Sequence, residues 1–287
     1  MTDESRSRAQ EITQRAIASF DDCASERLMT IMKSLTYHLH QFAKEVSLTT
    51  EEWMAGIDFL MATGKISSDK RNEFILLSDL LGLSSLQVAI NERADEATES
   101  TVLGPFFVEG AKVFQNGADI SNGAQGEATY VSITISDSAG EAISGVAVDV
   151  WGADADGFYD VQYKGDKLFN RGRFLSDDEG KVSFWSILPV AYPVPSDGPG
   201  GELLRATSRS NMRPAHIHFA LAKEGFRQVV THLFVDGDPY LGRDAVFGER
   251  DSLVCKFHRA SGDETATEAK LQTSHYEIQH NFTMARI

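Results

Sequence analysis

Two histidines separated by one residue, His216 and His218, form the strongest chemical signal in the sequence. In a β-strand, residues i and i+2 point to the same face, so the two imidazoles would stand side by side and could share one metal ion. Ile217 would then point into the opposite layer. Taken alone, the pair could also be two surface histidines that are close by chance.

Two tyrosines strengthen the case for a metal site. Tyr159 lies in Asp-Gly-Phe-Tyr-Asp and Tyr192 in Pro-Val-Ala-Tyr-Pro-Val-Pro. Such turn-rich segments often present side chains to a site, although each tyrosine alone could be a packing residue. Phenolate is a hard, anionic ligand that suits Fe(III) better than Zn(II), Cu(I) or Mg(II). Two imidazoles with two phenolates therefore indicate a mononuclear ferric site.

Arg213 adds a permanent positive charge next to these residues. It lies three residues before His216 and is followed by Pro214, which fixes the chain as it enters the strand. A guanidinium here can stabilise negative charge that develops on a substrate. The alternative is a surface salt bridge, and we favour the catalytic role because two candidate metal ligands follow so closely.

The elements before residue 100 must be helical. No proline occurs before Pro105, and apolar residues recur at the i, i+3, i+4, i+7 spacing of an amphipathic helix. Thr49 and Glu52 match a capping box, Gly64 can end the helix that follows, and Ser67 can begin the next one. The expected helices span residues 24–46, 49–64, 67–82 and 86–93.

After residue 100 the pattern changes to β-strands. Residues 130–136, 146–150 and 182–185 alternate or run apolar between turn signals, while the Pro- and Gly-rich stretch 189–201 indicates a loop. No βαβ alternation and no glycine-rich phosphate loop are present. The sequence therefore predicts an α+β protein: a helical unit over residues 1–100, with a linker around 95–108, and a mainly antiparallel β-sandwich over residues 101–287 that carries the site.

Charge and composition exclude several classes of protein. The 287 residues carry a formal net charge of −15, which argues against nucleic acid or an anionic membrane as the main partner. Two cysteines, Cys23 and Cys255, exclude a disulfide-dense scaffold and a Cys₄ zinc site. No apolar run is long enough to span a membrane, and the polar N-terminus lacks a signal-peptide pattern. We therefore expect a soluble, cytoplasmic protein.

The order of Tyr159, Tyr192 and Arg-Pro-Ala-His-Ile-His (213–218) resembles the intradiol ring-cleavage dioxygenases, and most of all their hydroxyquinol 1,2-dioxygenase branch. Thr-Val-Leu-Gly-Pro-Phe-Phe (101–107) and Asp-Gly-Asp-Pro-Tyr-Leu (236–241) are similar to that family as well. The resemblance implies a non-haem Fe(III) held by Tyr159, Tyr192, His216 and His218, with water or hydroxide as fifth ligand and Tyr192 leaving when substrate binds. It also implies cleavage of hydroxyquinol by O₂ to 3-hydroxy-cis,cis-muconate and maleylacetate.

The resemblance further implies which residues line the substrate pocket. Among them Asp79 stands in an otherwise apolar run, so it is either an acid on the helix surface or an acceptor for a third ring hydroxyl. His232 replaces a glutamine that many catechol-cleaving relatives carry, and it could act behind the ligands. The implied lining residues are Leu76, Asp79, Val102, Leu103, Gly104, Pro105, Phe106, Val194, Pro195 and Val246.

Partners and rival functions follow from the same reasoning. The resemblance, together with the wide apolar faces of the helices, implies a homodimer through the helical unit, with phospholipid enclosed in an apolar tunnel between the subunits. Catechol or a chlorocatechol is the alternative substrate. A non-catalytic β-sandwich binding module with an incidental histidine pair is a second alternative, and a zinc hydrolase is a weaker third.

Overall fold

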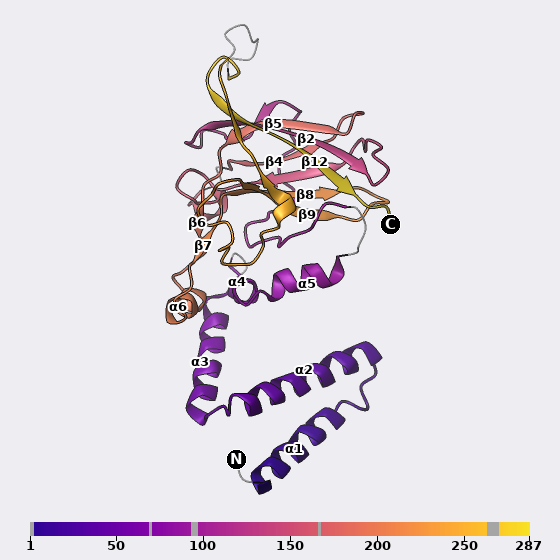
Figure 1. Ribbon diagram of the computed structural model, residues 1–287, viewed down its shortest axis with the longest axis vertical. Coiled ribbons are helices and arrows are strands. Elements are labelled where there is room, and N and C mark those ends of the chain that lie inside the picture. Colours follow the sequence, from indigo (N-terminus) through magenta and orange to yellow (C-terminus); the bar gives the residue numbers. More distant parts are fainter. Residues whose placement is uncertain (1–2, 69–70, 93–96, 166–167, 263–269) are drawn as a thin grey trace. The chain divides into compact units, whose positions relative to one another are not determined.

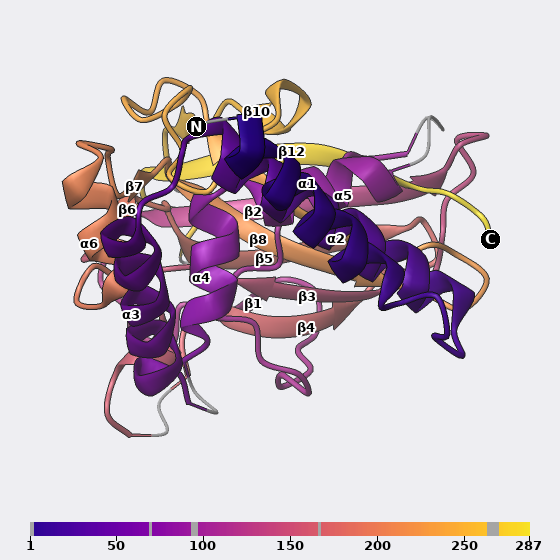
Figure 2. The same ribbon diagram turned by 90° about the horizontal axis from the view of Figure 1, so that it is seen from below.

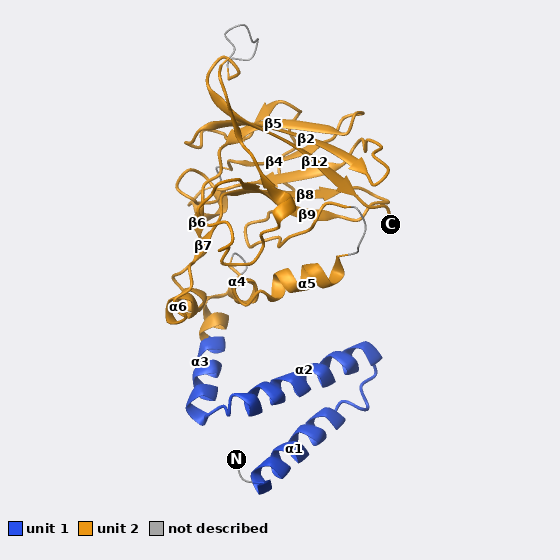
Figure 3. Ribbon diagram, in the orientation of Figure 1, with its two compact units in different colours: residues 1–61 blue, residues 62–287 orange. Residues whose placement is uncertain are grey.

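The computed structural model describes residues 3–68, 71–92, 97–165, 168–262 and 270–287. The chain forms two compact units, Met1–Met61 and Ala62–Ile287 (Figure 3). The first holds α1 (Asp3–Ala18), α2 (Glu26–Glu45) and most of α3 (Thr50–Ile66); the second holds everything from the end of α3 onward. In the first unit α1 packs along α2, where Lys44 Nζ donates a 2.7 Å hydrogen bond to Thr13 Oγ1.

Local sequence signals explain where most of these helices begin. The predicted capping box is present before α3: the Thr49 amide donates to the Glu52 carboxylate, and the Glu52 amide donates to Thr49 Oγ1. Ser67, however, does not begin the next helix. Asn72 caps α4 (Glu73–Leu80) instead, because its side chain accepts the Ile75 amide, while α3 continues past Gly64 to Ile66.

Two further differences concern helices. Helix α1 was not given bounds by the sequence pattern, and part of the predicted loop 189–201 enters α6 (Pro199–Ala206), which has proline at its first position. Helix α5 (Leu83–Asn91) begins and ends earlier than expected, and Arg93 lies outside the described residues, as do linker positions 95–96. Linker residues 97–108 contain neither helix nor strand.

The second unit is built on two five-stranded sheets that face each other, so the predicted α+β sandwich is confirmed. The first sheet has the order β1-β5-β2-β12-β11 and the second β10-β9-β8-β3-β4 (Figure 1). Most neighbours are antiparallel, but β2 runs parallel to β12 over nine residue pairs, and the short strands β1 and β10 run parallel to β5 and β9. The strands are β1 (Ala118–Asp119), β2 (Ala128–Asp137), β3 (Ala147–Trp151), β4 (Arg171–Leu175), β5 (Lys181–Ile187), β8 (His216–Ala222), β9 (Val229–Val235), β10 (Val254–Cys255), β11 (His258–Ala260) and β12 (His275–Met284).

The main core lies between the two sheets and leaves one face of the second sheet for the site. Val131 and Ile133 of β2 and Ile217 and Phe219 of β8 belong to this core. Helices α4 and α5 lie on the other side of the second sheet (Figure 1, Figure 2). A smaller apolar cluster joins α4, α6 and the neighbouring loops. The outer face of β8 is buried as well, since Ala220 there joins Trp151, Tyr159 and Tyr192 in a separate apolar cluster.

No single described helix is long and apolar enough to cross a membrane. Helices α4 and α5 would pass that test only when taken together, and they are bent by 76° from one another.

A candidate metal centre and substrate site

Strand β8 places the two predicted histidines on the outer face of the second sheet. His218 pairs in register with Trp151 on β3 and His232 on β9, while Ile217 between the histidines enters the sandwich core. His216 and His218 are each only 1% exposed. The alternation expected of a strand thus brings two buried imidazoles side by side, and two surface histidines are excluded.

Four donor atoms from three segments form a closed ring. Tyr159 Oη lies 2.9 Å from Tyr192 Oη and 2.9 Å from His218 Nε2. Tyr192 Oη lies 3.3 Å from His216 Nε2, and the two histidine Nε2 atoms are 3.1 Å apart. All four side chains that the sequence singled out as ligands therefore direct their donor atoms to one point.

Short local structures hold each tyrosine in place. Tyr159 precedes the 3₁₀ turn η1 (Asp160–Gln162), and Asp160 pairs with the buried Arg171 at 2.6 Å. Tyr192 begins β6 (Tyr192–Pro193), where it pairs with Arg213 of β7 (Met212–Arg213). Gly157, at φ +82°, lies so close that an added Cβ would come within 2.7 Å of the Tyr192 Cβ, so a side chain there would displace Tyr192.

The second nitrogen of each histidine is also engaged. His216 Nδ1 lies 2.6 Å from the Pro214 carbonyl oxygen, an acceptor, so this nitrogen carries the hydrogen. His218 Nδ1 lies 2.7 Å from His232 Nε2, and His232 Nδ1 lies 2.7 Å from Thr101 Oγ1. Such partners orient histidines that bind metals. The indole of Trp151 stacks on the His218 ring at 4.7 Å.

Burial sets the protonation state of the four donor groups. It lowers the pKa of His216 to about 3, with help from the Arg213 charge, and it lowers the pKa of His218 well below its usual value. It also raises the pKa of both Tyr159 and Tyr192, although Arg213 opposes that rise. Without a bound cation the four donors are therefore neutral, and a cation is the group that would ionise the phenols.

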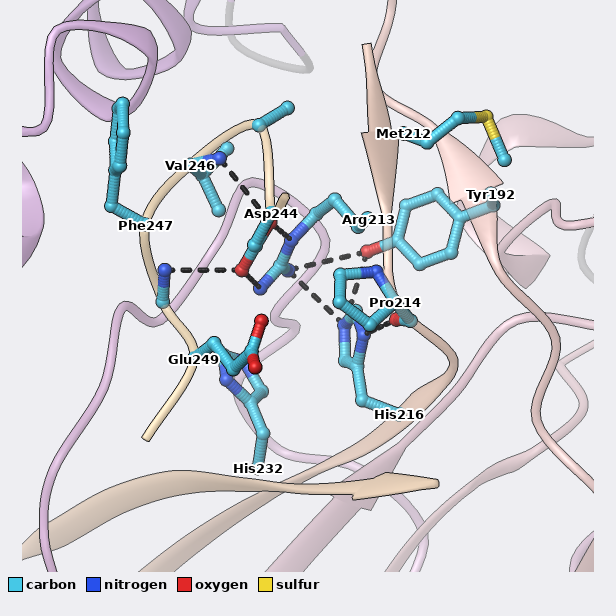
Figure 4. A network of polar contacts seen from close by, with 12 residues as sticks. Tyr192, Met212, Arg213, Pro214, His216, His232, Asp244, Val246, Phe247 and Glu249 are labelled. Carbon is cyan, nitrogen blue, oxygen red and sulfur yellow. Dashed lines mark hydrogen bonds and ion pairs between the residues drawn. The ribbon is translucent and has the colours of Figure 1, made fainter. Parts of the chain in front are cut away.

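Arg213 reaches the ring from a buried ion pair (Figure 4). Its Nε and Nη2 donate to the two carboxylate oxygens of Asp244 at 3.0 and 3.2 Å, and the same oxygens accept the amides of Val246 and Gly248. The remaining nitrogen, Nη1, lies 3.1 Å from His216 Nε2 and 3.4 Å from Tyr192 Oη. Arg213 is thus a buried arginine aimed at the ring, and a surface salt bridge is excluded.

A cavity of about 1090 Å³ lies beside α4, α5 and the segment before Phe106, and none of the four donor residues lines it. Asp79, Val102, Leu103, Gly104 and Pro105 contribute to its wall, whereas the other residues expected there do not: Leu76, Phe106, Val194, Pro195 and Val246. Gly104, at φ +74°, lies against the His218 ring, since a Cβ added there would be 3.4 Å from His218 Cε1. The wall segment therefore connects the cavity to the donor ring.

Comparison with known proteins identifies the family. Residues 102–282 match the family described as Dioxygenase, and residues 25–99 match Catechol dioxygenase N terminus. A 6-chlorohydroxyquinol 1,2-dioxygenase from Cupriavidus pinatubonensis is 51% identical over 85% of this chain and 89% of its own length. A hydroxyquinol 1,2-dioxygenase from Nocardioides simplex is 48% identical over 89% and 88%. The chain belongs to the intradiol dioxygenase family.

A solved structure supports the same assignment. Hydroxyquinol 1,2-dioxygenase from Pseudomonas putida DLL-E4 has a TM-score of 0.91 with 40% identity and covers 98% of this chain and 100% of its own. The wild-type catechol 1,2-dioxygenase of Acinetobacter radioresistens has a TM-score of 0.85 with 27% identity, covering 97% and 93%. The binding module with an incidental histidine pair is therefore excluded for this intradiol dioxygenase.

The structure also locates the other residues that the sequence singled out for the pocket. Asp79 is 3% exposed, so it is not an acid on the helix surface. Leu76, Val102, Val194 and Val246 share one buried apolar cluster. Leu103 and Pro105 are exposed, while Gly104, Phe106 and Pro195 are half-buried, and the Phe106 ring stacks on that of Tyr159 at 4.5 Å.

Sequence reasoning missed several residues that hold the site of this dioxygenase. Asp244, the partner of Arg213, lies 31 residues away in the chain, and Thr101, the partner of His232, lies 131 residues away. Asp160 and Arg171 form the buried pair behind Tyr159. Asp160 directly follows a predicted ligand, and that adjacency was the one local signal available.

Proposed function

We propose that this intradiol dioxygenase cleaves hydroxyquinol (1,2,4-trihydroxybenzene) between its two adjacent hydroxyl-bearing carbons. Both atoms of O₂ enter the product, 3-hydroxy-cis,cis-muconate, which tautomerises to maleylacetate. The observation that carries the proposal is the buried carboxylate of Asp79 in the cavity wall, an acceptor for the third hydroxyl that catechol lacks. The relatives named hydroxyquinol and 6-chlorohydroxyquinol dioxygenases give it further support.

Fe(III) is the metal that fits the donor ring. Neighbouring donor atoms 2.9–3.3 Å apart match ligands bonded at about 2.0–2.2 Å to one ion. Two phenol oxygens and two imidazole nitrogens are a hard set that favours a ferric ion over zinc. His232 could join His216 and His218 in a three-histidine group, but its Nε2 is already bonded to His218 Nδ1. We therefore assign the ligands as Tyr159, Tyr192, His216 and His218.

When bound, Fe(III) supplies the positive charge that ionises the phenols and withdraws electron density from the substrate ring, which makes the ring reactive toward O₂. The protein handles the protons and the remaining charge. Tyr192 would be the ligand that gives way to substrate, and its Oη would accept a proton from a substrate hydroxyl. Arg213, 3.4 Å from that oxygen, stabilises negative charge on Tyr192 and on the ring oxygens.

The pocket orients the ring through apolar contacts and one carboxylate. Asp79 accepts a hydrogen bond from the third hydroxyl, while the apolar residues contact the ring faces and exclude water. Gly104 leaves room for the ring beside His218, because a side chain at this position would fill that space. The proposed lining residues are Leu76, Asp79, Val102, Leu103, Gly104, Pro105, Phe106, Val194, Pro195 and Val246.

Two measurements test this function. The iron-loaded protein should have a visible tyrosinate-to-iron charge-transfer band, and it should consume O₂ faster with hydroxyquinol than with catechol. Tyr159→Phe and His216→Ala should each shift or abolish the band and stop ring cleavage. A colourless protein that contains iron, or a variant with unchanged colour and turnover, would overturn the ligand assignment. A wild-type preference for catechol would instead replace the substrate.

The first unit supports a second proposal, a homodimer. Apolar side chains on α2 and α3 are exposed, and five of them are 49–56% exposed: Leu35, Leu39, Phe42, Trp53 and Met61. Many large apolar side chains exposed on neighbouring helices usually mark an interface. We expect light scattering to report twice the 31.6 kDa chain mass at micromolar concentration. Lipid extraction followed by mass spectrometry would test for phospholipid held between the subunits.

A further inference from the structure

A chain of two hydrogen bonds leads from the donor ring to the cavity wall. His218 Nδ1 lies 2.7 Å from His232 Nε2, and His232 Nδ1 lies 2.7 Å from Thr101 Oγ1. All three residues are buried: His232 is 0%, His218 1% and Thr101 2% exposed. No solvent competes for these bonds, so each nitrogen depends on the partner that the protein provides.

The direction of these bonds decides whether His218 can bind a metal. A neutral imidazole carries one hydrogen, on either Nδ1 or Nε2, and the other nitrogen has the lone pair. If His218 Nδ1 donates to His232, then His218 Nε2 keeps its lone pair and faces Tyr159 Oη at 2.9 Å. If His232 donates instead, His218 Nε2 carries the hydrogen and cannot be a ligand.

Thr101 is the last residue in this series of hydrogen bonds, and its hydroxyl permits the direction in which His218 Nδ1 donates to His232. When His232 Nε2 accepts from His218, the hydrogen of His232 must lie on Nδ1, where Thr101 Oγ1 accepts it. Thr101 is held against the same strand, because its amide donates to the Val230 carbonyl at 2.7 Å and Thr231 Oγ1 donates to the Glu99 carbonyl. The backbone therefore fixes the distance between the hydroxyl and the imidazole.

We propose that His232 and Thr101 are positioning residues that hold His218 in the tautomer whose Nε2 can bind the metal. Thr101 begins the segment that continues through Val102 and Gly104 into the cavity wall, so the same segment shapes the substrate pocket and sets the metal ligand. This inference rests on the proposed function only in taking His218 as a ligand.

Metal affinity tests the inference, and substitutions at position 232 separate it from a simple packing role. Glutamine can replace both bonds, since its Oε1 accepts from His218 and its amide hydrogens donate to Thr101, whereas leucine can replace neither. His232→Leu should weaken iron binding by about 10- to 100-fold in a chelator competition. His232→Gln should remain close to wild type. Thr101→Val should weaken binding, and Thr101→Ser should restore it.

A histidine outside the site provides the matched control. His280 lies on β12 of the first sheet, where its Nδ1 is 3.4 Å from Cys255 Sγ and it contacts none of the four donor residues, so His280→Leu should leave the affinity unchanged. Zn(II) affinity is measured in parallel, because either metal needs the Nε2 lone pair. The ratio of the variant's metal affinity to that of the wild type can therefore still be interpreted if the metal is not iron. The thermal midpoint of each metal-free variant shows whether it is folded.

Three results would overturn the proposal. If His232→Leu binds both metals as tightly as wild type, His218 does not depend on His232. If His232→Gln loses as much affinity as His232→Leu, position 232 needs an imidazole, as it would if His232 were itself a ligand. If Thr101→Val leaves the affinity unchanged, Thr101 has no part in setting the tautomer.

Discussion

A single carboxylate decides which ring the site prefers. Asp79 is buried in the cavity wall; burial raises its pKa, while Ser84 and the charge of Arg213 favour its ionised form. With hydroxyquinol, the third hydroxyl can donate to this carboxylate. With catechol, the carboxylate would keep its hydrogen bond to Ser84 but would face an apolar ring edge without a hydrogen bond from the substrate, which costs free energy.

Replacing that carboxylate should therefore change specificity more than catalysis. A hydrogen bond to a charged group contributes about 1.5–3 kcal/mol, so Asp79→Ala should lower kcat/KM for hydroxyquinol about 10- to 100-fold. The value for catechol should be unchanged or higher, and the visible band should not move. Parallel oxygen-uptake assays with the two substrates measure this. Equal losses for both substrates would mean that Asp79 supports α4 rather than contacting the ring.

The contribution of Arg213 to stability, through its ion pair with Asp244, can be separated from its contribution to turnover. Removing the guanidinium leaves Asp244 buried and unpaired, so Arg213→Met should lower the free energy of unfolding by about 3–5 kcal/mol. Adding Asp244→Asn removes the unpaired charge and keeps an oxygen for one of the two backbone amides that Asp244 accepts, so it should restore part of that stability without restoring turnover. Denaturant unfolding and kcat measure the two effects. Recovery of turnover in the double variant would show that Arg213 acts only on stability.

The residues that could be predicted from the sequence lie close together along the chain, whereas those that were missed form contacts between distant segments. His216 and His218 were predicted because a strand of period two fixes their common face, whatever the rest of the fold. The Arg213–Asp244 pair and the His232–Thr101 bond depend instead on how distant loops meet. Spacing along the chain carries no information about such contacts, so His232 was recognised as unusual but not explained.

Among the helices and strands, a cap formed by neighbouring residues could be predicted from the sequence. The choice between two possible cap residues for the same helix could not. The Thr49 capping box formed as expected, whereas Ser67 lost to Asn72 as the cap of α4. Both residues are good caps, but the Ser67 hydroxyl donates to the Thr63 carbonyl of α3 and accepts the Glu73 amide at the start of α4. Helix α6 was missed because its glycines and proline resemble a loop, although proline is favoured at a first helical position.

The turn that carries Tyr159 should be sensitive to one methyl group. Gly157 and Gly117 have nearly the same positive φ, +82° and +84°, so alanine costs about 1–2 kcal/mol of backbone strain at either. A Cβ at Gly157 would meet the Tyr192 Cβ at 2.7 Å, whereas among the described residues no atom lies within 4 Å of one at Gly117. Gly157→Ala should shift the visible band and weaken iron binding.

Gly117→Ala is the matched control for that experiment. It should lose similar stability in denaturant unfolding and keep both the band and the iron affinity, because the strain is the same and the site is untouched. If Gly157→Ala also kept the wild-type spectrum, the loop before Tyr159 would be adjusting without moving Tyr192, and the close approach would not control the ligand.

For the whole molecule, the sequence predicted the class of fold but could not show how its helices are distributed. The change from helical to strand periodicity near residue 100 follows from local pattern and gave the α+β assignment. Along the chain, the boundary between the compact units lies between Met61 and Ala62, so α4 and α5 belong to the unit that contains the sandwich. Which core a helix joins depends on tertiary packing, here the cluster that Leu76 and Leu80 share with Val246.

The same burial that makes the site makes the stability of the whole chain depend on pH. Burial lowers the pKa of His216 to about 3 and that of His218 and His232 well below the usual value of about 6.5. In the unfolded chain these histidines take up protons below about pH 6.5, whereas in the folded protein they stay neutral. The stability they contribute is thus complete above about pH 6.5 and is lost as the pH falls toward their folded values.

The metal-free protein should therefore lose stability between about pH 6.5 and 5.5, by up to about 1.4 kcal/mol per pH unit for each histidine. Raised-pKa acids such as Asp79 and Glu249 act in the opposite direction but nearer their ordinary values, at lower pH. Urea unfolding at several pH values measures the slope, and His232→Gln should reduce it by the share of one histidine. An unchanged slope in that variant would mean that His232 is already protonated in the folded site, and it would contradict the proposed hydrogen bond from His218 Nδ1 to His232 Nε2.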